Sequence, residues 1–338
     1  MSLPVSIVIP AYNAQNLIAD VLGGIAGQDY TGRVELIVVN DGSIDDTAKI
    51  VEDFKAKLAA GSRDWLNLTL INQENQGAAA ATNTGFRAAA NEIVVSVDAD
   101  VVLQKNWLSL IVPELDDPQV GAVQGYYQTP AGVSFWARMM GYDVEARYDA
   151  IASKYVTQVC TGDTAYRKVA VEKAGYFDPA FKYGYDNDMS YKLSAAGYKL
   201  VIRKDALCDH FWKEKLSDYL KQQYRSAYGR MLLLKRHKNK VIGDSVSGVR
   251  MMAQAPLTLL IEVLLIAAIA IYPFSRLGLV PLLTAAAAMA IMLVDRIAFA
   301  LGIYKKQRDV AASCLPFIHL LRNVVWSFAI VRWSVKPR

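Results

Sequence analysis

Strand-like and helix-like segments alternate through the first hundred residues, and this alternation restricts the fold more than any other feature. Strands are predicted at residues 5–9, 34–39, 66–71 and 93–97, and helices at residues 14–28, 45–60 and 77–90. Strands separated by helices are joined by right-handed crossovers, which produce a mostly parallel sheet. The sequence therefore predicts an α/β fold with a Rossmann-like sheet in this part of the chain.

Polar, turn-forming residues follow each of the four predicted strands. The four sets are Pro10-Ala11-Tyr12-Asn13, Asn40-Asp41-Gly42-Ser43, Asn75-Gln76-Gly77 and Asp98-Ala99-Asp100. Ligands of parallel sheets bind beside the carboxyl ends of the strands. Any one of these sets is an ordinary turn or helix cap, but four in succession indicate a binding site at one edge of the sheet.

The last set carries two carboxylates, Asp98 and Asp100, directly after the buried strand at residues 93–97. A turn just past the strand lets both side chains converge, although alternation along a strand would separate them. Mg²⁺ binds proteins through one or two carboxylates together with substrate phosphates. The pair therefore indicates a phosphorylated substrate held through a metal, whereas an isolated Asp-x-Asp is more often a solvated turn.

Charge and cysteine content exclude several classes of protein. The net charge of the 338 residues is only +5, which argues against binding of a nucleic acid polymer. The three cysteines, Cys160, Cys208 and Cys314, are scattered without CxxC spacing, so neither a disulfide framework nor a zinc site is predicted. No basic segment followed by an apolar one begins the chain, so we expect no cleaved signal peptide.

Two apolar stretches at residues 255–272 and 279–301 are long enough to cross a bilayer. A short connection separates them, so a helical hairpin is predicted at about residues 254–302. Basic clusters at residues 235–240 and 305–308 flank its two open ends, and the positive-inside rule places both clusters in the cytoplasm. The sequence thus predicts a multi-pass protein of the cell membrane whose catalytic domain is cytoplasmic and which contacts membrane lipids.

A third hydrophobic helix at about residues 313–333 differs from these two. His319, Arg322, Asn323 and Trp326 recur on it at helical spacing and form one polar stripe. A third span would place Arg322 near the middle of the bilayer and would export the basic residues Arg332, Lys336 and Arg338. We therefore expect an in-plane interfacial helix, with a third span as the alternative. The amphipathic segment at residues 212–234 suits either a membrane surface or packing on the soluble domain.

The motifs, in this order and spacing, resemble the family 2 glycosyltransferases of the GT-A fold, whose membrane-bound members include enzymes that glycosylate polyprenol and lipid-linked glycans. Besides the four strand ends, the matching text is Thr161-Gly162 with Arg167, Gly175-Tyr176-Phe177-Asp178, Gly184-Tyr185-Asp186-Asn187-Asp188-Met189 and Gln222-Gln223-Tyr224-Arg225. The resemblance covers about residues 4–230. It implies a catalytic domain at residues 1–235, with a nucleotide-binding half at 1–100 and an acceptor half at 101–235. Residues 236–338 are then a membrane domain.

By this resemblance the chain is a hexosyltransferase that uses a UDP- or GDP-sugar and a divalent cation, Mn²⁺ or Mg²⁺. Asp98 and Asp100 would bind the metal, with His210 as a third ligand, and Asp186 would be the general base of an inverting reaction. The resemblance assigns the nucleotide-sugar to Pro10, Tyr12, Asn13, Asp41, Gln76, Gly77, Asp98, Arg167 and Arg225.

The sequence departs from the family pattern at two positions, and the acceptor has to be inferred from the residues near them. Tyr185 stands where the family usually has Glu, and Ser226 follows Arg225 where processive polymer synthases have Trp. The Asp at position 186 favours an acceptor hydroxyl on a lipid-linked or cell-surface glycan, because a polyprenyl phosphate is already anionic and needs no base. Three alternatives stay open: a polyprenyl-phosphate acceptor, a nucleotidyltransferase, and a non-catalytic membrane scaffold with the same fold.

Overall fold

The structure is a computed structural model, and it describes residues 2–61 and 64–335. By packing, the chain divides into two compact units. The first unit is Met1–Val133 with Tyr148–Trp212, and the second is Ser134–Arg147 with Lys213–Arg338. We predicted one boundary, after residue 235. The packing instead places α5 (Phe135–Asp149) and α8 (Leu216–Arg236) with the hydrophobic helices. The separation into a catalytic and a membrane domain stays a prediction.

A nine-stranded sheet forms the centre of the first unit, with the strand order β3-β2-β1-β4-β8-β6-β9-β5 and with β7 paired to β9. Its strands are β1 (Val5–Ala11), β2 (Val34–Asp41), β3 (Leu66–Gln73), β4 (Ile93–Val97), β5 (Val101–Leu103), β6 (Val120–Gln128), β7 (Tyr155–Val156), β8 (Asp163–Arg167) and β9 (Lys199–His210). The strands β3, β2, β1 and β4 are parallel to one another, as predicted.

Beyond β4 the sheet is mixed, because β8 runs antiparallel to both β4 and β6. The short strand β5 had no counterpart in the prediction. The sequence is also strand-like at residues 199–203, but β9 continues to His210 because its second half pairs with β5 and with the end of β6.

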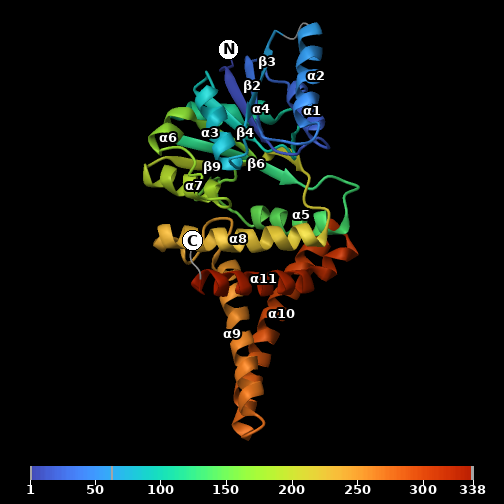
Figure 1. The fold of residues 1–338 in the computed structure, drawn as a ribbon, viewed down its shortest axis with the longest axis vertical. Helices are drawn as coiled ribbons and strands as arrows, with labels where there is room; N and C mark the ends of the chain where they lie inside the picture. Colours follow the sequence, from blue (N-terminus) through green and yellow to red (C-terminus); the bar gives the residue numbers. More distant parts are fainter. Residues whose placement is uncertain (1, 62–63, 336–338) are drawn as a thin grey trace. The chain divides into compact units, whose positions relative to one another are not determined.

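Helices pack on this sheet and are drawn in Figure 1. They are α1 (Ile18–Ala26), α2 (Thr47–Ala60), α3 (Ala78–Ala88), α4 (Trp107–Ile111) with the 3-10 turn η1 (Val112–Asp116), α6 (Lys168–Lys173) and α7 (Tyr185–Ala195). Gly85 lets α3 approach the sheet closely, because a Cβ at that position would lie 2.2 Å from the Val8 side chain. This approach fixes α3, and with it the loop that precedes its first turn, against β1.

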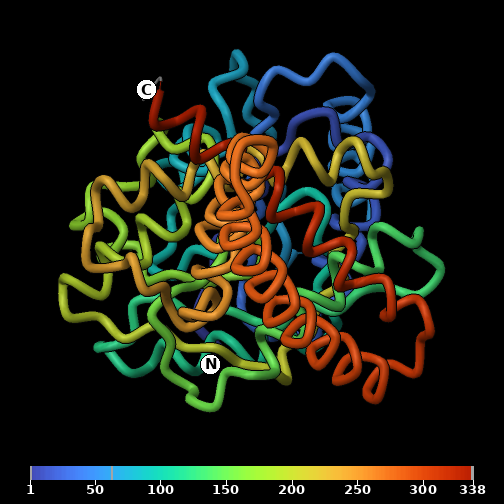
Figure 2. The backbone as a smooth tube through the Cα atoms, turned by 90° about the horizontal axis from the view of Figure 1, so that it is seen from below, coloured from blue at the N-terminus to red at the C-terminus, as the bar shows by residue number. Residues whose placement is uncertain are grey.

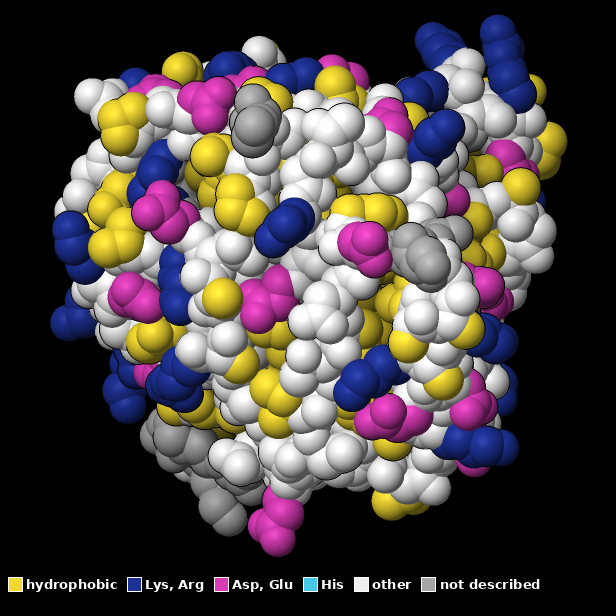
Figure 3. All heavy atoms as spheres, turned by 90° about the horizontal axis from the view of Figure 1, so that it is seen from above, with side chains coloured by type: hydrophobic (Ala, Val, Ile, Leu, Met, Phe, Trp, Pro, Cys, Tyr) yellow, Lys and Arg dark blue, Asp and Glu magenta, His cyan; other side chains and the backbone are white. Residues whose placement is uncertain are grey.

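Mixed charge covers the face shown in Figure 3, where Lys and Arg side chains are interspersed with Asp and Glu. A nucleic-acid surface instead gathers basic side chains into one patch or stripe. This one face carries no such patch, and the absence of a nucleic acid partner stays a prediction.

The second unit consists of helices. They are α5 (Phe135–Asp149), whose last turn belongs to the first unit, α8 (Leu216–Arg236), α9 (Val249–Ile271), α10 (Leu279–Gln307) and α11 (Leu315–Val335), with the 3-10 turns η2 (Lys238–Lys240), η3 (Arg276–Gly278) and η4 (Val310–Cys314). The helices α9 and α10 form the predicted hairpin around a small core of Ile261, Ala285 and Met292. Figures 1 and 2 show the hairpin projecting from the rest of this unit.

The helix α11 runs across the direction of the hairpin and packs on α8, α9 and α10 (Figure 1). Its polar stripe points into the unit, where His319 is 1% exposed and Arg322 is 5% exposed. The sequence predicts that these two side chains face headgroups or the catalytic domain of residues 1–235, and their partner Asp143 lies within that range. Its other face carries an exposed apolar stripe at helical spacing, which consists of Phe317, Leu321, Val324, Phe328, Val331 and Val335.

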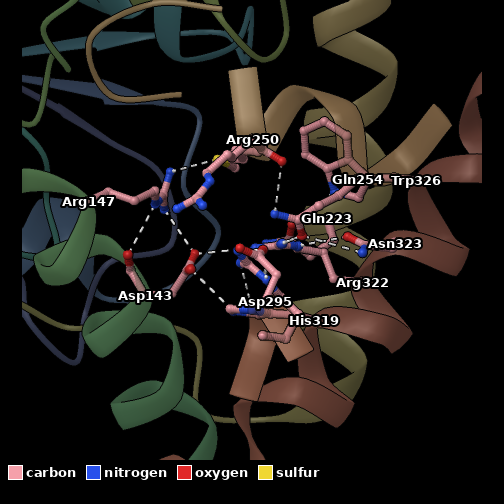
Figure 4. A network of polar contacts seen from close by, with 12 residues as sticks. Asp143, Arg147, Gln223, Arg250, Gln254, Asp295, His319, Arg322, Asn323 and Trp326 are labelled. Atoms are coloured by element: carbon pink, nitrogen blue, oxygen red, sulfur yellow. Dashed lines mark hydrogen bonds and ion pairs between the residues drawn. The ribbon is translucent and has the colours of Figure 1, made fainter. Parts of the chain in front are cut away.

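A buried ionic network explains why the polar stripe of α11 can be turned inward (Figure 4). The Asp143 carboxylate of α5 lies 3.2 Å from His319 Nε2 and 3.4 Å from Arg322 Nη1. Arg322 Nη2 also donates to Gln254 Oε1 of α9 at 2.7 Å. Burial alone would raise the pKa of Asp143, but Arg147, His319 and Arg322 hold that pKa well below its usual value. The network therefore stabilises Arg322 by a partner charge within the unit.

Candidate active site

The loops that follow β1 and β2 are joined by hydrogen bonds between their backbones and side chains. The Asn13 amide donates to Ser43 Oγ at 3.0 Å, and the Ile44 amide donates to Asn13 Oδ1 at 3.0 Å. Asn13 has a φ of +50°, in the left-handed region that asparagine tolerates better than most residues. Pro10 precedes this loop at the end of β1, and Tyr12 within it is 53% exposed, so its ring is open to a ligand.

Asp41, at the end of β2, shapes the neighbouring loop. The carboxylate accepts hydrogen bonds from Gln73 Nε2 at 2.7 Å and from the backbone amides of Gln76 at 2.9 Å and Gly77 at 2.8 Å. Each carboxylate oxygen has two lone pairs, so contact with a nucleotide base is still compatible with these bonds. The predicted role in base binding stays a prediction, whereas the role in holding the Gln76-Gly77 loop is visible in the structure.

Gly77 begins α3 with a φ of +93°, a conformation that side-chain-bearing residues rarely adopt. A Cβ at Gly77 would meet no atom within 4 Å, so the space in front of this backbone is open. Both properties fit the predicted close approach of a donor to the loop.

Asp98 and Asp100 follow β4, and His210 ends β9. The antiparallel pairing of β5 with β9 places His210 opposite Val101, and the Phe211 amide donates to the Asp100 carbonyl at 2.9 Å. The His210 ring stacks on Trp212 with 3.7 Å between ring centroids, and it meets the edge of Tyr127 at 5.0 Å. The extension of β9 that sequence reasoning missed is therefore what brings His210 beside Asp100.

These residues fit a metal that is completed by its substrate. Within residues 2–61 and 64–335, no group of three or more His, Cys, Asp or Glu side chains is arranged to hold a metal ion. The three predicted ligands thus do not form a closed protein site. Mg²⁺ sites of enzymes commonly have only one or two carboxylates, and the oxygens of substrate phosphates complete the coordination.

Asp186 lies in the first turn of α7, where the helix dipole favours a carboxylate. Its Oδ1 accepts a hydrogen bond from the Asn187 amide at 2.9 Å. Tyr185, in the place of the family's usual Glu, receives a hydrogen bond from Thr161 Oγ1 at 3.2 Å. Burial, followed by the charge of Asp98, raises the pKa of Tyr185 well above its usual value, and Asp186 adds to this effect. Thr161 and Gly162 thus link the two parts of the site, because the Asp98 amide donates to the Gly162 carbonyl at 3.1 Å.

Arg167 does not belong to this group. Because β8 is antiparallel to β4, Arg167 pairs with Ile93, at the end of β4 opposite to Asp98. Its guanidinium donates to the backbone carbonyls of Leu115, Val120 and Asp117 at 2.5, 3.2 and 3.0 Å. The structure therefore does not bring Arg167 together with the strand-end residues, and the guanidinium holds a loop instead. Its contact with the donor stays a prediction.

Arg225 lies on α8 in the second unit, with its side chain exposed. Its contact with the diphosphate stays a prediction.

Two site residues were missed by the sequence analysis. Tyr127 on β6 is 4% exposed and touches His210, and Asp163 at the start of β8 is fully buried. The available signal for Asp163 was an acidic residue after the Thr161-Gly162 motif, inside a segment that is otherwise suitable for a strand. Without the position of β8, that signal could not be distinguished from a solvated loop residue.

The parallel strands with their polar carboxyl ends, the helix α7 with Asp186 and the strand β9 with His210 have the arrangement of a glycosyltransferase of the GT-A fold. The chain belongs to glycosyl transferase family 2. A family model described as Glycosyl transferase family 2 matches residues 6–175, and one described as Glycosyl transferase family group 2 matches residues 93–301.

Curated relatives include the poly-beta-1,6-N-acetyl-D-glucosamine synthases of Staphylococcus aureus, which are 27% identical over 231 residues, and of Staphylococcus epidermidis, 27% identical over 232 residues. Each alignment covers 67% of this chain and 54% of the relative, so the chain spans about half the length of these relatives.

Solved structures share the fold. The mannosyltransferase PcManGT from Pyrobaculum calidifontis, in complex with GDP-Man and Mn²⁺, has a TM-score of 0.63 and 22% identity. That match covers 100% of this chain and 89% of that one. Residues 1–349 of TarS from S. aureus, in complex with UDP-GlcNAc, have a TM-score of 0.51 and 16% identity, with 98% and 92% of the two chains covered.

Proposed function

We propose that this protein transfers a hexose from a nucleotide-diphosphate sugar to an acceptor hydroxyl, with inversion at the anomeric carbon. The donor is a UDP- or GDP-sugar, in keeping with the ligands named for the structurally similar mannosyltransferase and TarS. The acceptor belongs to a lipid-linked or cell-surface glycan. The observation that carries the proposal is that Asp98, after β4, and Tyr185, next to Asp186, are both tied to the Thr161-Gly162 segment. The Asp98 amide donates to the Gly162 carbonyl at 3.1 Å, and Thr161 Oγ1 donates to the Tyr185 hydroxyl at 3.2 Å.

The donor would lie along the carboxyl ends of β1, β2 and β3. Tyr12 offers an open aromatic face for the base, and Asp41 with the Gln76-Gly77 loop borders the same edge. The open space at Gly77 admits the diphosphate close to the backbone.

Asp98 and Asp100 would hold a divalent cation, Mn²⁺ or Mg²⁺, with His210 beside them. When bound, such a cation offsets the negative charge that develops on the departing diphosphate. The Asp186 carboxylate would accept the proton of the acceptor hydroxyl. A single carboxylate with one displacement implies inversion, because retention through a covalent intermediate requires a second, nucleophilic carboxylate.

A polyprenyl-phosphate acceptor is the second candidate. The specific observation in its favour is Tyr185, whose hydroxyl is neutral where the family usually has a carboxylate. A site with one acidic group fewer repels an anionic acceptor less. A non-catalytic scaffold with the same fold is the third candidate, and it predicts no sugar transfer.

The donor assay tests the function. We expect the purified full chain, in detergent or vesicles, to release nucleoside diphosphate from one member of a panel of UDP- and GDP-sugars. We expect this release only with Mn²⁺ or Mg²⁺ present, and not with EDTA. Release without a divalent cation would contradict the metal site, and no release with any donor and glycan or polyprenyl-phosphate acceptor would favour the scaffold.

Among the described residues, three helices are apolar and long enough to cross a membrane: Val249–Ile271, Arg276–Gln307 and Val310–Val335. We propose that the first two span the membrane and that α11 lies in the cytoplasmic interface. The crosswise course of α11 and the inward contacts of Arg322 support this arrangement. An Arg in the middle of a bilayer costs at least ~2.5 kcal/mol on insertion scales. An anchored enzyme then meets acceptors that are confined to the same membrane surface.

Cysteine labelling tests this topology. In a Cys314→Ser background, we expect Ser334→Cys to react with an impermeant thiol reagent only from the cytoplasmic side. Phe274→Cys, in the connection between α9 and α10, is the matched control and should react only from outside, since Phe274 is 90% exposed. Labelling of position 334 from outside would establish a third span. The basic residues Lys336 and Arg338, on which the prediction also drew, lie outside the described residues.

A further inference from the structure

Asp163 is a carboxyl group in the interior of the sheet that the proposed mechanism does not use. It begins β8, is 0% exposed, and pairs in register with Val97, the residue before Asp98. Burial of an acidic group without a compensating partner is costly, so a fold retains one only where it has a specific task or specific contacts. The surroundings of Asp163 show what that task is.

The contacts of Asp163 lead toward the donor site. Cys208 Sγ lies 3.5 Å from Asp163 Oδ2, and the Tyr127 hydroxyl and the Gln124 amide hydrogen-bond to the same carboxyl. Burial raises the pKa of Asp163 well above its usual value, and the Asp98 carboxylate adds to the increase.

Two glycines make room for this arrangement. A Cβ at Gly125 of β6 would lie 2.9 Å from Asp163 Oδ2 and 2.4 Å from Trp107 Nε1, so no other residue fits beside the carboxyl. A Cβ at Gly162 would lie 2.7 Å from both Asp98 Oδ2 and the Tyr127 hydroxyl. The Tyr127 hydroxyl and the Asp98 carboxylate thus both lie close to Gly162, the residue before Asp163.

We propose that Asp163 is a positioning residue of the donor site: it holds the Tyr127 hydroxyl over Gly162, and this hydroxyl orients the Asp98 carboxylate. The Tyr127 and His210 rings also lie nearly perpendicular to each other, at 5.0 Å between centroids, so the same tyrosine lies near two of the predicted metal ligands. The inference rests on the proposed function, because it assigns Asp98 to donor or metal binding.

Calorimetry of nucleoside diphosphate binding, with Mn²⁺ and with EDTA, tests the inference on the full chain. We expect Asp163→Leu to weaken Mn²⁺-dependent binding about 10- to 100-fold, as removal of outer ligand-orienting partners does in metal sites. Its melting temperature should be unchanged or higher, because an apolar side chain replaces a buried acid. Asp163→Asn, which keeps the shape and a hydrogen-bonding group, should restore most of the binding.

Tyr127→Phe separates positioning from a general effect on the fold. We expect it to reproduce the loss in Asp163→Leu, and the double variant to bind no more weakly than either single variant, because both changes break one chain of contacts. Thr164→Val is the matched control: it removes a fully buried polar group from the next position of β8, and we expect unchanged binding.

Three results would overturn the inference. They are binding by Asp163→Leu within twofold of the unmodified protein, additive losses in the double variant, and a Tyr127→Phe variant that binds normally. If Asp163→Leu does not fold, Asp163→Asn and Tyr127→Phe still decide the matter. Failure of the unmodified protein to bind any nucleoside diphosphate with Mn²⁺ would instead contradict the proposed function itself.

Discussion

Replacement of Asp100 by alanine is expected to abolish sugar transfer while the fold is retained. Asp100 lies in the short turn between β4 and β5, and its backbone carbonyl accepts a hydrogen bond from the Phe211 amide, just past the end of β9. Alanine keeps this backbone bond and removes only the carboxylate. Without the Asp100 carboxylate, the cation has one protein ligand fewer and no longer links the protein firmly to the donor diphosphate. Both turnover and metal-dependent donor binding should therefore disappear.

The measurement combines turnover with donor binding in Mn²⁺, and a thermal melt checks the fold. Asp53→Ala makes the same chemical change on the exposed surface of α2 and should leave both activities unchanged. Full activity of Asp100→Ala in Mn²⁺ would show that Asp100 has no part in holding a metal.

Asp186→Asn is expected to reduce kcat by about 10²-fold or more, with little change in donor affinity. The amide has the shape of the carboxylate and can keep the bond from the Asn187 amide, which now reaches Asp186 Oδ1 at 2.9 Å. It cannot accept a proton from the acceptor hydroxyl. The change therefore acts on the transition state and leaves the ground-state complex with the donor intact.

The size of this loss also reports on the acceptor. A polyprenyl phosphate needs no base, so with that acceptor Asp186→Asn should lose much less activity than with a glycan hydroxyl. Asp53→Asn serves as the matched control. Equal and small losses with both acceptors would remove Asp186 from the role of general base.

Sequence patterns predicted the half of the sheet that is built from local repeats. The strands β1, β2 and β3 are each followed by a helix, so the period of apolar residues and the turn residues lie within one short segment. For the same reason the strand-end residues Tyr12, Asp41, Gly77 and Asp98 could be recognised before their partners were known. The hairpin of α9 and α10 was equally accessible, because length and hydropathy suffice to identify it.

The rest depended on pairings between distant segments. Because β8 is antiparallel to β4, Arg167 pairs with Ile93 at the end of β4 far from Asp98. For the same reason Asp163 pairs with Val97, the residue before Asp98. Likewise, β9 reaches His210 because it pairs with β5, which lies about a hundred residues earlier. Strand direction and partner choice arise from contacts far apart in sequence, and a single segment carries little trace of them.

The second unit shows the same division. The sequence by itself determined that α11 carries a polar stripe with His319 and Arg322. Only the tertiary structure decided that this stripe faces Asp143 of α5, nearly 180 residues earlier in the chain, at 3.2 and 3.4 Å. A helical pattern fixes which side chains share a face, because that follows from 3.6 residues per turn. Which residues contact that face depends on how the other helices pack. Here the Asp143 carboxylate supplies the negative charge that the sequence of α11 lacks.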